Sequence, residues 1–316
     1  MEGGLGEVGM PTNTSMNYAG KSLPRIRGKL LLQEPMSLHT SFKIGGPADI
    51  FAVPNSIYDL RKLLRWSQAN SINIIILGAG TNMLVSDKGV RGMVIELGSG
   101  FGYVRIENHE VRAGGGAKLS RVLRTSLGRG LSGLEGVAGI PGTVGGAVCT
   151  NAGTPAGCIA DCLAAVKAVN AQGEMSKLPA SELEFRYRGS ALQDSELVVV
   201  EAMFRLRPEE PAAIDQIVES LMSRRRRTQP AGVGTAGSVF KNPSKGYAGE
   251  ILDGAGAKGM QVGGARVSKK HANFIENTGN ASAEDVRELM VRLQKLALDK
   301  CGVALEPEIQ LVGGWQ

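Results

Sequence analysis

The sequence predicts an α+β protein of two domains. Its 316 residues match two domains of ~150 residues each, and its 42% hydrophobic content can fill globular cores. Strand and helix patterns alternate over the first two thirds of the chain, and the polar segment 208–211, with two prolines and two glutamates, interrupts them. We therefore expect a first domain over 36–208 and a smaller second domain over 209–316.

The elements of the first domain follow from local patterns. Residues 1–35 show no clear period, so we expect an N-terminal leader that is partly mobile. The segment 49–53 predicts a short strand, Ser56 with Asp59 predicts a capped helix start, and the apolar run 74–77 predicts a buried strand. Further strands are predicted at 93–97, 103–106, 110–112, 164–170 and 197–206, and a helix with leucines on one face at 119–127.

The second domain begins and ends with elements that have clear limits. A helix is predicted over 212–227, directly after the polar break. Ser282 predicts the cap of another helix, with acidic residues in its first turn and Gly302 after its end. A last strand is predicted at 308–312.

The composition argues against several classes of protein. The 36 basic and 30 acidic residues leave a net charge of +6, which favours anionic ligands without selecting one. No stretch approaches 18 apolar residues, and nothing near the N-terminus has the pattern of a targeting segment. Metal binding is not predicted because no Cys-x-x-Cys pair is present; the cysteines are Cys149, Cys158, Cys162 and Cys301, and the histidines are His39, His109 and His271. We expect a cytoplasmic protein.

Glycine is the compositional outlier, with 44 residues, twenty of them between Gly78 and Gly157. The first dense loop, Gly78-Ala-Gly-Thr-Asn-Met-Leu84, follows an apolar strand, so its backbone N–H groups could line a concavity that suits a diphosphate. A dinucleotide fingerprint of the Rossmann type is not supported, because Met83 stands where the third glycine belongs and no helix pattern follows. The alternative is an ordinary tight turn.

A second dense loop covers 133–153. It contains Gly139-Ile-Pro-Gly-Thr-Val-Gly-Gly146 and Asn151-Ala-Gly153, and such a loop can bring main chain close to a flat or charged ligand. The alternative for both loops is a pair of structural corners without a ligand.

Two arginine motifs could bind anions. In Phe185-Arg-Tyr-Arg-Gly-Ser190 the guanidinium of Arg188 presents a fork that matches a carboxylate or phosphate, although an ordinary surface arginine is the alternative. The run Arg224–Arg227 ends a predicted helix, and without an aromatic ladder it favours a phosphate-bearing small ligand over nucleic acid.

The C-terminal third contains a serine motif and a carboxylate pair. Gly237-Ser-Val-Phe-Lys-Asn-Pro243 lacks the Gly-x-Ser-x-Gly elbow, so Ser238 is not predicted to be a hydrolase nucleophile. In Leu305-Glu-Pro-Glu308 the two carboxylates lie on one side of an extended chain, and their repulsion would favour one protonated form. A solvated strand entry is the alternative.

Taken in this order, the motifs resemble those of the UDP-N-acetylenolpyruvoylglucosamine reductases, the MurB flavoenzymes. The resemblance runs from Ser41 to Gly313 and includes Ser41-Phe-Lys-Ile-Gly-Gly-Pro-Ala-Asp49 in addition to the motifs above. The interval between Gly189 and Gly237 has no tyrosine, so the chain resembles the shorter branch, which lacks a tyrosine loop insertion. One departure is Thr154-Pro-Ala-Gly-Cys158, where members of the family often have Ala-Tyr-Gly-Gly-Glu.

The resemblance implies a two-lobed FAD-binding domain of the vanillyl-alcohol-oxidase (PCMH) type and a smaller α+β substrate-binding domain. It implies reduction of UDP-N-acetylglucosamine enolpyruvate to UDP-N-acetylmuramate, with NADPH as hydride donor, in peptidoglycan precursor synthesis. It also implies links to cell wall biogenesis, cell shape, cell division and the cell cycle. Because no histidine or cysteine lies in Gly78–Leu84, we expect FAD to be non-covalent. No nucleic acid, membrane or obligate protein partner is expected.

The resemblance also assigns roles to residues of this chain. Ser238 would protonate the substrate carbon, and Arg188 and Glu308 would stabilise the enolate-like intermediate, Glu308 in its neutral form. The expected cofactor-binding residues are Gly78, Ala79, Gly80, Thr81, Asn82, Met83, Leu84, Ile140, Pro141, Gly142, Thr143, Gly145, Gly146, Asn151 and Gly153. The expected substrate-binding residues are Tyr187, Arg225, Arg227, Lys241, Asn242 and His271.

Two other classes of function remain open at this point. Another FAD-dependent oxidoreductase of the same fold, acting on a hydroxy acid, would keep the glycine loops without needing the motif around Ser238. A non-enzymatic anion-binding protein would account for the net charge and the arginine run.

Overall fold

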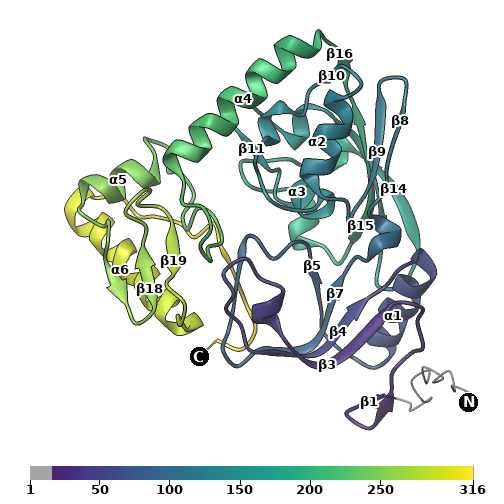
Figure 1. Ribbon diagram of the computed structural model, residues 1–316. Helices are drawn as coiled ribbons and strands as arrows, with labels where there is room; N and C mark the ends of the chain where they lie inside the picture. The colour runs from purple at the N-terminus through teal and green to yellow at the C-terminus, as the bar shows by residue number, and fades with distance from the viewer. Residues whose placement is uncertain (1–15, 316) are drawn as a thin grey trace, which may run out of the picture.

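The computed structural model describes residues 16–315. Figure 1 shows two lobes in purple and teal and a smaller domain in green and yellow, with helix α4 (Pro211–Thr228) running from the upper lobe towards that domain. We call residues 16–97 lobe 1, residues 104–208 lobe 2 and residues 229–315 the C-terminal domain. No helix of the described residues is long and apolar enough to cross a membrane.

Lobe 1 is a four-stranded sheet with one helix on it. The strand order is β3-β4-β7-β5, with β3 antiparallel to β4 and the other two pairings parallel. Helix α1 (Ile57–Ala69) begins as predicted, because the Ser56 hydroxyl accepts the backbone N–H of Asp59 at 3.1 Å. Its leucines pack on one face of the sheet. The strands are β3 (Lys29–Pro35), β4 (Pro47–Val53), β5 (Ile74–Leu77) and β7 (Val90–Glu96).

Two expectations for lobe 1 need correction. The segment 1–35 is not wholly a leader, because every residue of β3 except Gln33 pairs with β4; residues 1–15 lie outside the described part. Strand β5 was expected to be buried, yet only Leu77 is, and Ile76 is 38% exposed. Strand β5 forms one edge of its sheet; Ile74 and Ile76 line a cavity, although Ile74 also packs against the core under α1.

Lobe 2 is a five-stranded antiparallel sheet in the order β14-β13-β15-β9-β8. The central strand β15 (Val198–Arg205) is buried over almost its whole length, and the helices α2 (Leu119–Leu127) and α3 (Val144–Cys149) join the same core. Helix α4 packs here too, through Val218 and Leu221. The expected boundary at 208 placed this helix in the second domain. Its apolar contacts, however, are with lobe 2. The other strands are β8 (Val104–Glu107), β9 (Glu110–Gly114), β13 (Leu163–Val169) and β14 (Met175–Pro179).

The C-terminal domain packs a small sheet against two helices. Helix α6 (Ala283–Cys301) has the predicted capping box between Ser282 and Asp285, and Gly302 ends it in the left-handed conformation, with φ of +67°. The other elements are α5 (Ala248–Gly254), β17 (Gln261–Val262), β18 (Ala265–Val267) and β19 (Ile275–Asn277), of which the strands form one antiparallel sheet.

The C-terminal domain is joined firmly to lobe 1. The last strand, β20 (Gln310–Val312), pairs in parallel with β6 (Met83–Val85), directly after the first glycine loop. The Asp87 carboxylate accepts the backbone N–H groups of Ala283 and Glu284 at 2.9 and 3.2 Å, so a lobe 1 side chain caps the start of α6. The chain end therefore returns to lobe 1 and brings residues around 308 to its glycine loop.

Short pairings and 3-10 turns complete the fold. The two-residue strands pair as β1 (Asn17–Tyr18) with β2 (Lys21–Ser22), β10 (Leu131–Ser132) with β16 (Arg207–Pro208), and β11 (Gly153–Thr154) with β12 (Gly157–Cys158). The 3-10 helices are Met36–Leu38, Ser99–Phe101, Glu135–Val137, Ile159–Asp161, Ala180–Glu182 and Ala191–Asp194.

Candidate active site

A cavity of about 1370 Å³ lies where the two lobes and the C-terminal domain meet. Its walls are the first glycine loop, the segment 140–155, the end of α4 and the segments around residues 238, 271 and 308. The volume exceeds the roughly 300–1,000 Å³ of most small-molecule sites, so it can hold a cofactor together with a substrate.

The first glycine loop supplies unpaired backbone donors. The backbone N–H groups of Ala79, Gly80 and Thr81 donate no hydrogen bond to any described residue. Gly80 has φ of +61°, and a Cβ there would lie 2.0 Å from the backbone oxygen of His39, so only glycine fits. Free N–H groups in a tight, side-chain-free loop form a concavity that binds phosphate.

The second glycine loop faces the first. The Thr81 hydroxyl donates to the backbone oxygen of Pro141 at 3.2 Å, and a Cβ on Gly78 would lie 2.9 Å from Oγ1 of Thr143. Some of its glycines serve packing alone, since a Cβ on Gly139 would lie 2.7 Å from the sulfur of Met222 in α4. Ligand approach and helix packing therefore both account for the glycine density of this loop.

The donors and the cavity fit FAD. A diphosphate matches the two opposed loops, and the flat rings match the apolar wall that β5 contributes through Ile74 and Ile76. Of the expected cofactor-binding residues, those at 78–83, 140–143, 145–146 and 153 line the cavity. Two do not: Leu84 is fully buried in the core between lobe 1 and the C-terminal domain, and the Asn151 side chain points elsewhere.

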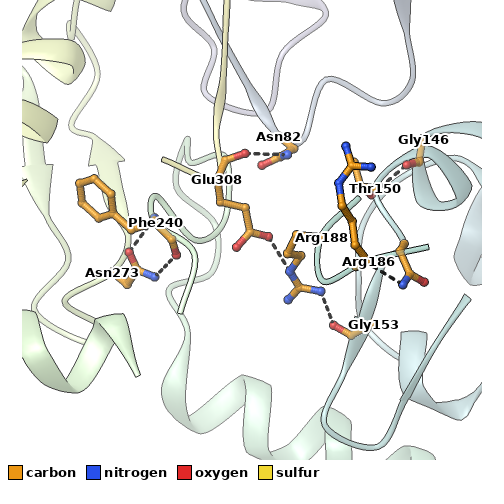
Figure 2. A network of polar contacts seen from close by, with 10 residues as sticks. Asn82, Gly146, Thr150, Gly153, Arg186, Arg188, Phe240, Asn273 and Glu308 are labelled. Carbon is orange, nitrogen blue, oxygen red and sulfur yellow. Dashed lines mark hydrogen bonds and ion pairs between the residues drawn. The ribbon is translucent and has the colours of Figure 1, made fainter. Parts of the chain in front are cut away.

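An ion pair crosses the cavity from lobe 2 to the C-terminal domain. Nε of Arg188 lies 2.8 Å from Oε1 of Glu308, and Nη1 donates to the backbone oxygen of Gly153 at 2.9 Å (Figure 2). Among the described residues, Nη2 of Arg188 has no acceptor. Both side chains line the cavity, so the guanidinium keeps a donor for an anionic ligand.

Burial raises the pKa of the Glu308 carboxyl, and the nearby charge of Arg188 opposes this shift only in part. The expected cause, repulsion from Glu306, is wrong: that carboxylate is 78% exposed and pairs with Lys241 at 3.3 Å. The structure thus explains a tendency of Glu308 towards the neutral form by desolvation.

Backbone contacts place Glu308 beside Ser238 and the first glycine loop. The Glu308 N–H donates to the backbone oxygen of Val239 at 2.8 Å, next to Ser238 in the chain. On the other side, Nδ2 of Asn82 donates to the backbone oxygen of Glu308 at 3.1 Å (Figure 2). Ser238 also lines the cavity. Three segments far apart in sequence therefore meet at one end of the cavity.

Burial favours the neutral form of His271. Burial lowers its pKa, and its Nδ1 accepts the backbone N–H of Asn273 at 3.2 Å, so in the neutral ring Nε2 carries the proton. Nearby Asn242 uses Oδ1 to accept the N–H of Ala248 at 3.1 Å. Both line the cavity, and each keeps a donor group for a ligand.

Arginines at the end of α4 add positive charge. Arg224, Arg225 and Arg227 all line the cavity. Burial and the charge of Arg188 lower the pKa of Arg225, so this guanidinium lies in a partly desolvated, cationic region. Such a region attracts a ligand with several negative charges.

Two expected substrate contacts lie outside the cavity lining. Tyr187 is 56% exposed, with its ring centroid 5.3 Å from Cζ of Arg188, and Lys241 turns towards Glu306.

Some residues line the cavity that the sequence did not lead us to expect, and Lys118 is one of them. The glycine run 114–116 just before it, ahead of a helix start, is the sequence signal that could have identified it. The other unexpected polar residues of the lining include Glu96, Tyr247, Lys258 and Lys270.

Comparison with known proteins gives matches over most of the chain. Residues 48–179 match an FAD binding domain, and residues 229–312 match the UDP-N-acetylenolpyruvoylglucosamine reductase C-terminal domain. The UDP-N-acetylenolpyruvoylglucosamine reductase 2 of Symbiobacterium thermophilum is 41% identical over 293 residues, which is 93% of this chain and 95% of that protein. The reductase of Caldanaerobacter subterraneus is 44% identical over 286 residues, covering 90% and 94%.

A solved structure also matches. The UDP-N-acetylenolpyruvylglucosamine reductase of Thermus caldophilus superposes with a TM-score of 0.80 at 34% identity, covering 91% of this chain and all of that one. The fold class predicted from the sequence is confirmed: a PCMH-type FAD-binding domain precedes a smaller α+β domain.

Proposed function

The chain belongs to the UDP-N-acetylenolpyruvoylglucosamine reductase family, and we propose that it reduces the enolpyruvyl group of UDP-N-acetylglucosamine enolpyruvate to UDP-N-acetylmuramate. NADPH is the hydride donor and FAD the bound carrier. The observation that supports this most directly is the meeting of Arg188, Glu308 and Ser238 at one end of the cavity that the glycine loops line. A hydroxy-acid oxidoreductase of the same fold is not favoured by these relatives.

FAD would be held by the free N–H groups of the first loop and by the facing segment 140–146. When bound, it supplies the hydride for the methylene carbon of the substrate after accepting one from NADPH. The remaining steps depend on the side chains of this chain, which bind the substrate carboxylate, stabilise the charge that develops and deliver a proton.

Arg188 binds the substrate carboxylate through the donor that the structure leaves free. Hydride addition leaves a carbanion next to that carboxylate, with its charge spread as an enolate. Arg188 meets this charge directly, and Glu308 donates a hydrogen bond to it from its neutral form. Burial of Glu308 supports this role, because desolvation favours the protonated carboxyl.

Ser238 donates the proton that completes the reduction. An enolate beside a carboxylate is basic enough to take a proton from an alcohol when bulk water is excluded. The backbone bond between Glu308 and Val239, the residue after Ser238, supports these roles because it keeps the two segments adjacent. Serine needs no activating base here, so the absence of a hydrolase motif agrees with this role.

The UDP diphosphate would lie near the arginines of α4. Arg225 and Arg227 line the cavity, Arg225 close enough for the charge of Arg188 to lower its pKa, and Asn242 and His271 offer donors from the C-terminal domain. The product is a peptidoglycan precursor, so the protein would act in the cytoplasm and serve cell wall biogenesis, and through it cell shape, division and the cell cycle.

An anaerobic absorbance series tests the function. The protein is measured as isolated, after NADPH and then after UDP-N-acetylglucosamine enolpyruvate. We expect an oxidised flavin spectrum that bleaches with NADPH and returns with the enolpyruvyl substrate. If the flavin is reduced by NADPH but stays reduced, the FAD-binding fold stands and the proposed substrate is wrong. If no flavin binds even after FAD is added, the proposed function is wrong altogether.

A further inference from the structure

Asn151 sits beside the cavity without lining it. It follows helix α3, it is 9% exposed, and its backbone has φ of +43°, a left-handed conformation that asparagine tolerates better than most residues. The sequence predicted that Asn151 contacts the cofactor. Its neighbours Thr150 and Ala152 line the cavity, but Asn151 itself does not, so its side chain needs a different account.

Both ends of the Asn151 amide are engaged with backbone. Oδ1 accepts the N–H of Ala160 at 3.1 Å, and Nδ2 donates to the backbone oxygen of Arg186 at 3.2 Å. A buried amide whose oxygen and nitrogen both have partners has a definite orientation. Asn151 therefore ties two separate segments of lobe 2 together.

The second of these segments carries Arg188. Arg186 and Gly189 exchange backbone hydrogen bonds at 3.0 and 3.1 Å, which makes a tight turn with Tyr187 and Arg188 at its tip. Arg188 has φ of +58°, an unfavourable conformation for a residue with a Cβ. Such a conformation persists only where surrounding contacts impose it.

Contacts from the segment 149–153 impose it. Besides the Asn151 amide, the backbone oxygen of Cys149 accepts the Ser190 hydroxyl at 2.9 Å, and the backbone oxygen of Gly153 accepts Nη1 of Arg188 at 2.9 Å. Asn151 supplies the side-chain bond in the middle of this segment, and Figure 2 shows Arg188 bonded to Gly153 at its end. The segment also continues from α3, whose Gly145 and Gly146 line the cavity.

We infer that Asn151 is a positioning residue for Arg188. It holds the 186–189 turn so that the guanidinium faces Glu308 and the substrate end of the cavity, in a fixed position relative to the second glycine loop. This inference rests on the proposed role of Arg188 in the second half-reaction. It assigns Asn151 no contact with FAD.

Two variants test it. Asn151→Gly removes the amide at a backbone conformation that glycine adopts freely, and Asn151→Asp keeps the acceptor for Ala160 but places an oxygen against that of Arg186. We expect FAD affinity and flavin reduction by NADPH to change less than about twofold, because the proposed function uses Arg188 only with the enolpyruvyl substrate. Reoxidation by the enolpyruvyl substrate should slow about 10- to 100-fold, as expected when a reacting group is misplaced.

Three further measurements separate positioning from a general structural role. In an Arg188→Met background, Asn151→Gly should cause no additional slowing, because the residue through which it acts is gone. The control Asn108→Gly removes another left-handed asparagine of lobe 2, at the tip of the β8–β9 hairpin, and should leave both half-reactions unchanged. Without any substrate, the Glu308 carboxyl should titrate at higher pH in Asn151→Gly than in the wild type, because the opposing charge of Arg188 has moved.

The outcomes distinguish the alternatives. A loss of FAD affinity in Asn151→Asp would make Asn151 a cofactor contact and overturn the inference. Equal slowing of both half-reactions would also overturn it. The same holds if Asn151→Gly slows reoxidation further in the Arg188→Met background, or if the titration of Glu308 is unchanged. If the wild type itself is reduced by NADPH but not reoxidised by the substrate, the proposed function fails, and the titration of Glu308 still decides whether Asn151 positions Arg188.

Discussion

Glu306 and Glu308 lie two residues apart and occupy opposite environments. The Glu306 side chain is 78% exposed and pairs with Lys241 at 3.3 Å, while the Glu308 side chain is 17% exposed and pairs with Arg188 at 2.8 Å. Both are acidic residues facing a single cation, so pairing alone does not distinguish them. Burial does: the Glu306 side chain stays in water, whereas desolvation raises the pKa of the Glu308 carboxyl.

The difference shows what makes an ion pair chemically useful in this fold. An exposed pair is screened by water and contributes little to stability. At the edge of a buried cavity, desolvation favours the neutral form of the Glu308 carboxyl and the charge of Arg188 opposes it. A carboxyl balanced in this way can take part in proton transfer and in stabilising charge. Five substitutions test whether the two glutamates differ to this degree.

Removing each carboxylate should give the largest contrast. Glu308→Ala deletes a hydrogen bond to the developing charge, and we expect reoxidation of the flavin by the enolpyruvyl substrate to slow about 10²- to 10³-fold. Glu306→Ala should change it less than about twofold. Stopped-flow absorbance under anaerobic conditions measures both. Similar rates for the two variants would contradict the separation of the two environments.

Changing the cation of the buried pair should have a smaller effect. Arg188→Lys keeps the charge but loses the planar fork that can contact Glu308, the Gly153 oxygen and a substrate carboxylate together. We expect reoxidation to slow about 10- to 100-fold while reduction by NADPH stays close to the wild-type rate. A lysine variant as fast as the wild type would mean that charge alone suffices.

The pH dependence gives a third test. Because the pKa of Glu308 is raised, its neutral form persists above the range of an ordinary glutamate, and reoxidation should fall about tenfold per unit once the pH rises past that pKa. Glu308→Gln cannot titrate, so its rate should be flat in that window. The comparison requires a pH–rate series for both proteins.

The same shift has a consequence for stability. The folded chain holds the Glu308 proton more tightly than the unfolded chain, so the stability that this group contributes is present at low pH and is lost as the pH rises through its raised folded pKa. The melting temperature of Glu308→Gln minus that of the wild type should therefore increase as the pH rises. A difference that is constant with pH would contradict the raised pKa.

The exposed pair should give the smallest effect. Breaking the contact between Lys241 and Glu306 by Glu306→Gln should change the free energy of unfolding by at most about 0.5 kcal/mol, because both side chains remain hydrated. Urea unfolding at low and high salt measures this. A larger, salt-insensitive loss would show that the pair is not the solvated contact seen here.

Much of the secondary structure could be predicted because its signals are local. The caps of α1 and α6 depend on contacts between Ser56 and Asp59 and between Ser282 and Asp285, three residues apart. Strand β3 was missed, since an edge strand exposed on most of its residues shows no clean alternation. The expected burial of β5 was wrong because Ile74 and Ile76 line a cavity, and apolar composition does not distinguish a ligand wall from a core.

The site could be predicted in part for a similar reason. Motif residues such as Gly80, Arg188 and Ser238 belong to short segments whose residue types indicate their chemistry, and all three line the cavity. Leu84 and Asn151 lie in or next to those motifs but turn away from the cavity. Adjacency in the sequence does not determine the direction of a side chain, and here strand pairing and the 186–189 turn determine it.

The sequence by itself determined the helices and their caps, the glycine loops and the family, because each depends on residues close together in the chain. Only the tertiary structure decided the state of Glu308. Its carboxyl is desolvated because β20 pairs with β6, more than 220 residues earlier, and because lobe 2 places Arg188 against it. Burial is a property of atoms brought together from distant segments, so a neighbour two residues away can have the same chemistry and remain in water.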